Sequence, residues 1–202
     1  YRIPTSIEET TRLLAEEGDR AQRVTGQTDL MLSLRDSPEA FDVVVDMTRI
    51  PELQALQFSH SRGLTIGAAV PWCRIVEHPQ MTAHYPCLTL VAGLVRSIAV
   101  EGRSTIGCNL CRRPSCSDAL PALIALQATG TIAGCEGKRT IQLEQLWASP
   151  EHLALKEDKV LISVHVPAPA PSSGAWYMPF HPNEKMGNIF VRLAVSLALD
   201  QS

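Results

Sequence analysis

The sequence predicts an α+β fold. Hydrophobic residues account for 45% and charged residues for 19% of the 202 positions, a composition typical of a globular chain that buries a large core. Segments with β-branched or alternating apolar residues, such as 43–45 and 160–166, favour strands. Between them lie apolar segments of helical length, such as 88–97, and turns that contain glycine.

The chain is expected to begin with a helix. Thr5 or Ser6 can cap its first turn, and Glu8 and Glu9 place negative charge at the positive end of the helix. Gly18 follows the last apolar positions and predicts the helix C-terminus.

A strand, a glycine turn and a second helix are expected next. Residues 23–25 predict a short strand that runs into Gly26, and residues 29–35 predict a helix. Residues 41–47 contain a run of valines that suits a buried strand. The first glycine turn is therefore expected between a strand and a helix.

The middle of the chain is expected to alternate between strands and buried helices. Residues 134–137 have a glycine at each end and predict a hairpin turn. The other expected elements are strand 64–68, helices 71–77, 88–97 and 121–127, and strands 129–133 and 139–141.

Two strands and a linker are expected toward the C-terminus. Residues 160–166 alternate between apolar and polar side chains, as in a half-buried strand, and residues 167–174 predict a linker or extended loop. Residues 189–199 alternate with a period of two and predict a strand with an open edge. We expect a partner chain or self-association to cover that edge, or the chain to have been cut there.

The two glycine turns are the candidate binding elements. A glycine between a strand and a helix lets a ligand approach the main chain, and the positive helix end attracts an anion. Gly26 is followed by Thr28, and Gly107 is flanked by Thr105 and Asn109. Two such turns can hold a pyrophosphate from opposite sides, but a single glycine at a turn is also common as a plain backbone device.

Seven motifs carry a resemblance to a known family. In chain order they are Tyr1-Arg2-Ile3-Pro4-Thr5-Ser6-Ile7-Glu8-Glu9, Thr25-Gly26-Gln27-Thr28-Asp29-Leu30, Val45-Asp46-Met47-Thr48-Arg49-Ile50-Pro51-Glu52-Leu53, Leu64-Thr65-Ile66-Gly67-Ala68, Tyr85-Pro86-Cys87-Leu88, Thr105-Ile106-Gly107-Cys108-Asn109-Leu110 and Ser117-Asp118-Ala119-Leu120-Pro121-Ala122-Leu123. With these motifs the chain resembles the FAD-binding domain, or medium subunit, of the molybdopterin dehydrogenase (molybdenum hydroxylase) family, which includes carbon monoxide dehydrogenase and xanthine dehydrogenase. The resemblance spans roughly residues 1–165, and seven ordered matches are far more specific than one glycine turn.

The resemblance implies the two-subdomain FAD-binding fold of the vanillyl-alcohol oxidase/p-cresol methylhydroxylase type. Residues 1–56 would form an N-terminal α/β FAD-binding subdomain, and residues 57–168 a second, α+β subdomain. Residues 169–202 would form a linker and the start of a truncated C-terminal subdomain.

The resemblance also implies FAD as the cofactor, extended between the subdomains with its pyrophosphate held by both turns. The residues assigned to the cofactor are Thr25, Gly26, Gln27, Thr28 and Asp29 in the first turn and Thr105, Gly107, Cys108 and Asn109 in the second. Ser117 and Asp118 match a small polar residue and an aspartate that reach the cofactor in the family. From the sequence alone, Asp118 is instead the predicted cap of a helix at 119–126, and both roles can coexist.

The function implied by the resemblance is electron transfer in an oxidoreductase. A molybdopterin-binding large subunit would oxidise the substrate, and a 2Fe-2S small subunit would relay the electrons. FAD would then pass them to an acceptor such as NAD, oxygen or a quinone. This chain would need no catalytic base, nucleophile or metal ligand of its own, and the six histidines show no metal-ligand or triad-like spacing.

Two positions depart from the family pattern. Gln27 and Cys108 stand where the family usually has a second glycine, which permits close backbone approach and φ values that a side chain disfavours. A second interpretation is therefore a non-catalytic assembly subunit that keeps the same fold.

The cysteines allow a third interpretation. Three of them lie close together in the sequence, namely Cys108, Cys111 and Cys116. With Cys135 as a fourth ligand they could bind an iron–sulfur cluster. Arg112 and Arg113 beside them could instead make them reactive thiols with a lowered pKa. The cysteines could also be ordinary free thiols that bind no cluster and have no special reactivity.

The composition argues against two other classes of protein. With a net charge of −3 and only 5% aromatic residues, the chain offers neither a basic nor a base-stacking surface to nucleic acid. No apolar segment approaches the roughly 20 residues of a membrane-spanning helix. Tyr1 is not an initiator methionine. Because the first residues show no leader pattern, we expect a cytoplasmic protein.

Overall fold

The structure is a computed structural model that describes residues 1–26, 42–94, 102–111, 117–149, 152–153, 155–180 and 191–199. The helix predicted at 29–35 lies outside these residues. Among the helices that the structure describes, none is both long and apolar enough to cross a membrane.

The first helix, α1 (Ile7–Glu17), begins and ends where the sequence predicts. The Ser6 hydroxyl accepts a hydrogen bond from the Glu9 amide at 3.1 Å, and the Glu9 carboxylate accepts one from the Thr5 amide at 2.7 Å. The first bond satisfies an amide in the first turn of the helix, and the second satisfies the amide of the residue just before the N-cap. Gly18 ends the helix with a φ of 54°, a conformation that favours glycine.

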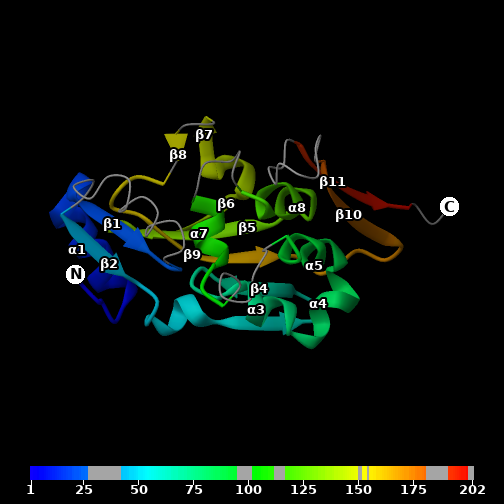
Figure 1. The fold of residues 1–202 in the computed structure, drawn as a ribbon, viewed down its shortest axis with the longest axis horizontal. Helices are drawn as coiled ribbons and strands as arrows, with labels where there is room; N and C mark the ends of the chain where they lie inside the picture. Colours follow the sequence, from blue (N-terminus) through cyan, green and yellow to red (C-terminus); the bar gives the residue numbers. More distant parts are fainter. Residues whose placement is uncertain are drawn as a thin grey trace.

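A two-stranded parallel sheet follows α1. After a short 3-10 turn, η1 (Gly18–Arg20), strand β1 (Ala21–Val24) pairs with β2 (Val43–Asp46), so both predicted strands are confirmed. α1 packs against this unit, at the N-terminal end of the molecule (Figure 1).

The larger sheet has five antiparallel strands in the order β3-β4-β9-β5-β6. Its strands are β3 (Leu56–Ser59), β4 (Gly63–Gly67), β5 (Thr129–Gly134), β6 (Gly137–Gln142) and β9 (Val160–Val166). The hairpin predicted at 134–137 joins β5 to β6, and Gly137 has a φ of 109° there. β9 keeps the predicted alternation, with Ser163 and His165 half-buried between buried neighbours, but lies in the centre of the sheet.

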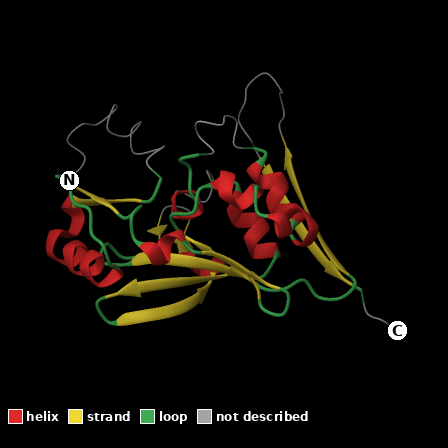
Figure 2. Cartoon of the chain, turned by 90° about the horizontal axis from the view of Figure 1, so that it is seen from below, coloured by secondary structure: helices red, strands yellow, loops and turns green. Residues whose placement is uncertain are grey.

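Helices gather on one side of this sheet (Figure 2). They are α3 (Trp72–Val76), α4 (Pro79–His84), α5 (Pro86–Ala92), α7 (Ile106–Cys111) and α8 (Ala119–Ala125). α5 ends at Ala92, earlier than predicted, and α8 begins two residues before Pro121. The shorter elements are η2 (Pro51–Gln54), η4 (Leu143–Leu146) and the paired strands β7 (Trp147–Ser149) and β8 (His152–Leu153).

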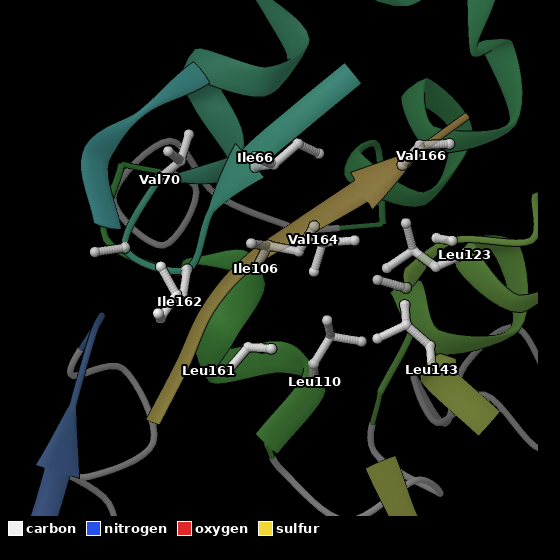
Figure 3. Packing of buried hydrophobic residues seen from close by; sticks show 14 of the residues in the cluster. Ile66, Val70, Ile106, Leu110, Leu123, Leu143, Leu161, Ile162, Val164 and Val166 are labelled. Carbon is white, nitrogen blue, oxygen red and sulfur yellow. The ribbon is translucent and has the colours of Figure 1, made fainter. Parts of the chain in front are cut away.

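One continuous core joins the helices to the sheet. Ile106 and Leu110 of α7 pack among Leu161 and Val164 of β9 (Figure 3). α7, which carries the second glycine turn, is thereby fixed against the central strand.

The C-terminal strands form a separate hairpin beside α5 and α8 (Figures 1 and 2). β10 (Ser173–Phe180) pairs antiparallel with β11 (Val191–Ala198), so the predicted last strand is confirmed. The predicted linker ends earlier than expected, because β10 begins at Ser173. One face of the hairpin is exposed and apolar, with Trp176, Met178, Phe180, Val191, Leu193, Val195 and Leu197 on it.

Leu123→Ala tests the core. Leu123 is fully buried in α8, so the truncation should lower the free energy of unfolding by about 3 kcal/mol in a denaturant titration. Leu197→Ala is the matched control, because Leu197 is 66% exposed on the hairpin and should change the value by less than about 0.5 kcal/mol. Equal losses from both substitutions would contradict this packing.

Candidate functional site

The two glycine turns touch each other. A Cβ placed on Gly26 would lie 2.5 Å from the Arg103 carbonyl oxygen and 3.1 Å from the Thr105 nitrogen. These distances leave no room for a side chain, so glycine is what allows the end of β1 to approach the second turn. Gly26 does not have a positive φ, and its role is close approach alone.

Two threonine hydroxyls meet at this contact. The Thr105 hydroxyl donates a hydrogen bond to the Thr25 hydroxyl at 3.1 Å and accepts one from the Cys108 amide at 3.2 Å. Thr105 is buried. The Thr25 hydroxyl, which accepts from Thr105, keeps its own proton to donate to a further acceptor.

The second turn is the first turn of α7. A Cβ on Gly107 would lie 2.6 Å from the Ala68 carbonyl oxygen, and the Gly107 amide donates to that oxygen at 2.9 Å. The Ile106 amide donates to the Val70 carbonyl at 3.3 Å. These amides already have protein acceptors, so the attraction of the junction for an anion rests on the Thr25 hydroxyl and on Arg103, which is exposed at the second turn.

Cys108 occupies its position without backbone strain. It lies within α7, and among the described residues only Gln127 and Ser172 have a positive φ without being glycine. The unusual φ expected where the family has a second glycine is therefore absent at Cys108. Gln27, the other departure, lies outside the described residues, as do Thr28 and Asp29.

Asn109 ties the second turn to the start of α8. Its side-chain oxygen accepts from the Ser117 hydroxyl at 2.8 Å and from the Ala119 amide at 3.1 Å. The Ser117 hydroxyl in turn accepts from the Leu120 amide at 3.1 Å. Four predicted site residues, Thr105, Cys108, Asn109 and Ser117, thus belong to one hydrogen-bonded network.

Asp118 stands at the N-cap position of α8, as predicted, but the capping hydrogen bond expected of it is absent. Its side chain makes no capping bond, because Ser117 and Asn109 already hold the first amides of the helix. Asp118 Oδ1 instead accepts from Arg192 Nε of β11 at 2.6 Å. Arg192 was not among the predicted site residues, and it is 74 positions away in the sequence.

Cys111 does not have the lowered pKa that is expected of a reactive thiol. Burial raises the pKa of Cys111 to about 11, although the nearby charge of Arg23 lowers it, so the prediction of a lowered pKa is wrong for this residue. Cys135 lies on the β5–β6 turn, and its thiol contacts the Thr11 carbonyl oxygen at 3.7 Å. Within the described ranges, no three Cys, His, Asp or Glu side chains are placed to share a metal ion, and Cys116, Arg112 and Arg113 lie outside those ranges.

Three histidines that are scattered in the sequence gather around Phe58. The His84 ring stacks on Phe58 with centroids 5.0 Å apart, and the His60 ring meets Phe58 edge-on at 5.0 Å. His78 lies 6.3 Å from the same ring. These contacts join β3 to α4 by aromatic packing, which spacing in the sequence could not reveal.

Comparison with known sequences places this site in context. A family model described as "FAD binding domain in molybdopterin dehydrogenase" matches residues 1–169. The xanthine dehydrogenase FAD-binding subunit of Escherichia coli O157:H7 is 22% identical over 202 residues, which are 100% of this chain and 65% of that protein. The carbon monoxide dehydrogenase medium chain of Hydrogenophaga pseudoflava is 27% identical over 177 residues, 88% of this chain and 61% of that protein. The chain thus spans 61–65% of the length of these relatives.

A solved structure agrees with the sequence matches. Carbon monoxide dehydrogenase from Hydrogenophaga pseudoflava, in a form that lacks the Mo-pyranopterin moiety of the molybdenum cofactor, superposes with a TM-score of 0.85 at 26% sequence identity. The superposition covers 94% of this chain and 65% of that chain.

Gly26→Ala tests the contact between the turns. The added methyl group would overlap the Arg103 carbonyl, so we expect the free energy of unfolding to fall by about 2 kcal/mol. Gly174→Ala is the matched control, since a Cβ there meets nothing within 4 Å, and it should be neutral or slightly stabilising. A Gly26→Ala protein as stable as the wild type in the same denaturant titration would show that the turns do not touch.

Alkylation rates test the cysteines. At pH 8 a thiol with a pKa of about 11 is ionised in about one molecule per thousand, so iodoacetamide should label exposed Cys135 long before Cys111. Peptide mass spectrometry over a time course gives the order of labelling. Labelling of Cys111 at the rate of Cys135 in the folded protein would restore the reactive-thiol interpretation.

Proposed function

Because the chain belongs to the FAD-binding domain family of the molybdopterin dehydrogenases, we propose that it binds FAD where the two glycine turns meet and serves as the flavin component of a molybdenum hydroxylase. The observation that carries the proposal is the junction itself. Gly26 lies against the Arg103 carbonyl, and the hydroxyls of Thr25 and Thr105 face each other there.

The fold is the one that the resemblance implied. It is an α+β structure of the vanillyl-alcohol oxidase/p-cresol methylhydroxylase type, as in the carbon monoxide dehydrogenase flavoprotein. We keep the division into residues 1–56, 57–168 and 169–202 as a proposal, supported by the three separate sheets, although β3 of the five-stranded sheet begins at Leu56.

The donors at the junction suit a phosphate-bearing cofactor. The Thr25 hydroxyl offers a neutral donor, oriented by the bond that it accepts from Thr105, and Arg103 offers a positive charge at the second turn. In this proposal Gly26, Gln27, Thr28 and Asp29 bind from the first turn, and Gly107, Cys108 and Asn109 from the second. Because the amides of α7 donate within the protein, hydroxyls and charge contribute more to phosphate binding here than the amides do.

The proposed activity requires positioning more than acid–base chemistry. When bound, FAD supplies the redox chemistry that passes electrons from iron–sulfur clusters to an external acceptor. The chain's part is to bind and orient the cofactor. Asn109 and Ser117 keep the start of α8 fixed against the second turn, and the packing of α7 on β9 keeps that turn rigid.

The partners proposed for the chain are a molybdopterin-binding large subunit and a 2Fe-2S small subunit. Carbon monoxide dehydrogenase and xanthine dehydrogenase supply the analogy. We also propose a cytoplasmic location. The thiols of Cys73, Cys87, Cys111 and Cys135 are free, which suits a reducing compartment.

Thr105→Val tests the site. The substitution keeps the shape and removes the hydroxyl that orients Thr25, so FAD affinity should fall about tenfold or more as the Thr25 donor loses its fixed direction. Flavin fluorescence titration of the intact protein gives the dissociation constant. Thr140→Val, at an exposed position of β6, is the matched control and should bind FAD as the wild type does.

Two results would contradict the proposal. If the wild-type protein is colourless and takes up no FAD in excess, the chain is a non-catalytic assembly subunit. If the wild type binds FAD and Thr105→Val binds it equally well, the junction is not the binding site.

A further inference from the structure

An ion pair joins the C-terminal hairpin to the start of α8. Arg192 Nε on β11 donates to Asp118 Oδ1 at 2.6 Å, and the two side chains are only 14% and 24% exposed. A surface pair contributes little to stability, and a shielded pair is costly unless its geometry is good. Helix capping does not account for this pair, because Ser117 and Asn109 hold the first amides of α8.

The hairpin presents Arg192 from its inner face. Arg192 lies opposite Pro179 in the pairing of β11 with β10, and Pro179 follows buried Tyr177 by two residues. Burial, and then the negative charge of Asp118, raise the pKa of the Tyr177 hydroxyl to about 12. Tyr177 therefore stays neutral beside the pair, and the Arg192 charge is what balances Asp118.

The pair is continuous with the network at the second glycine turn. Asp118 follows Ser117, whose hydroxyl donates to Asn109, and the Asn109 amide donates to the Thr105 carbonyl at 3.1 Å. A displacement of Asp118 would therefore be passed through Ser117 and Asn109 to Thr105, the residue that faces Thr25.

In the proposed function Asp118 reaches the cofactor, so the charge of the pair bears on cofactor binding. A carboxylate near an anionic pyrophosphate repels it, and the repulsion is large where water is partly excluded. A guanidinium held on that carboxylate cancels much of the repulsion and fixes its orientation, while the remaining lone pairs can accept hydroxyl donors.

We propose that Arg192 is a positioning residue for the flavin site, which holds Asp118 neutralised and oriented so that this carboxylate can face FAD. The hairpin thereby takes part in cofactor binding although it lies outside both glycine turns. The inference rests on the proposed FAD site.

A double-mutant cycle on the intact protein, purified with any subunits that accompany it, tests the inference. The variants are Arg192→Met, Asp118→Asn and the two combined, with Arg139→Met on exposed β6 as the matched control. FAD affinity and the midpoint potential of the bound flavin are measured at a temperature where thermal unfolding shows that every variant is folded.

Arg192→Met should weaken FAD binding at least tenfold, and added salt should recover part of the loss by screening the unpaired carboxylate. The potential of the flavin should become more negative, because an uncompensated negative charge opposes the uptake of electrons. Since Arg192 acts through Asp118, the double variant should bind FAD as Asp118→Asn does. Arg192→Lys should restore part of the affinity, because it keeps the charge but not the planar donor.

The outcomes separate a positioning role from a structural one. If Arg192→Met lowers only the unfolding temperature, leaving FAD affinity and potential unchanged, the pair serves stability alone and the inference is wrong. Additive losses in the cycle would also overturn it, because Arg192 would then act independently of Asp118. If the wild-type protein binds no FAD, the proposed function itself is wrong. That result differs from the stability-only outcome and from the additive outcome.

Discussion

The close contact between Gly26 and the second glycine turn is the constraint on which the site depends. Backbone atoms of Arg103 and Thr105 occupy the space that a side chain at position 26 would need. Gly107 makes an equally close approach to Ala68, which holds the first turn of α7 against the end of β4. Two segments about 80 residues apart can therefore bring their threonine hydroxyls within hydrogen-bond distance.

The rest of the structure holds this contact in place. The core packs α7 on the central strand β9, and Asn109 and Ser117 connect α7 to α8. Arg192 extends the same set of contacts to the hairpin. The hairpin also exposes an apolar face. This face is a contiguous patch, unlike the single exposed hydrophobic residues that are common on protein surfaces. A site whose function is to orient a cofactor benefits from such rigid support, because small displacements cost affinity.

Local elements could be predicted from the sequence, whereas long-range pairings could not. Ser6 and Gly18 mark the ends of α1, and the glycines at 134 and 137 mark a hairpin, because each signal acts within a few residues. The central position of β9 depends on pairing with β4 and β5, which no local pattern specifies. The same holds for the site. The glycine turns could be found from motifs, but the Asp118–Arg192 pair depends on the docking of a distant hairpin. Asp118 holds the predicted N-cap position, yet Ser117, which Asn109 orients, bonds the Leu120 amide in its place.

The most direct test of the account is a crystal structure of the intact protein with FAD bound. We predict that the pyrophosphate lies at the junction of the two turns, with an oxygen within hydrogen-bond distance of the Thr25 hydroxyl, which Thr105 orients. The Asp118–Arg192 pair should remain formed beside it. FAD bound elsewhere, or a junction closed by the Cys108 side chain with no cofactor in it, would contradict the account.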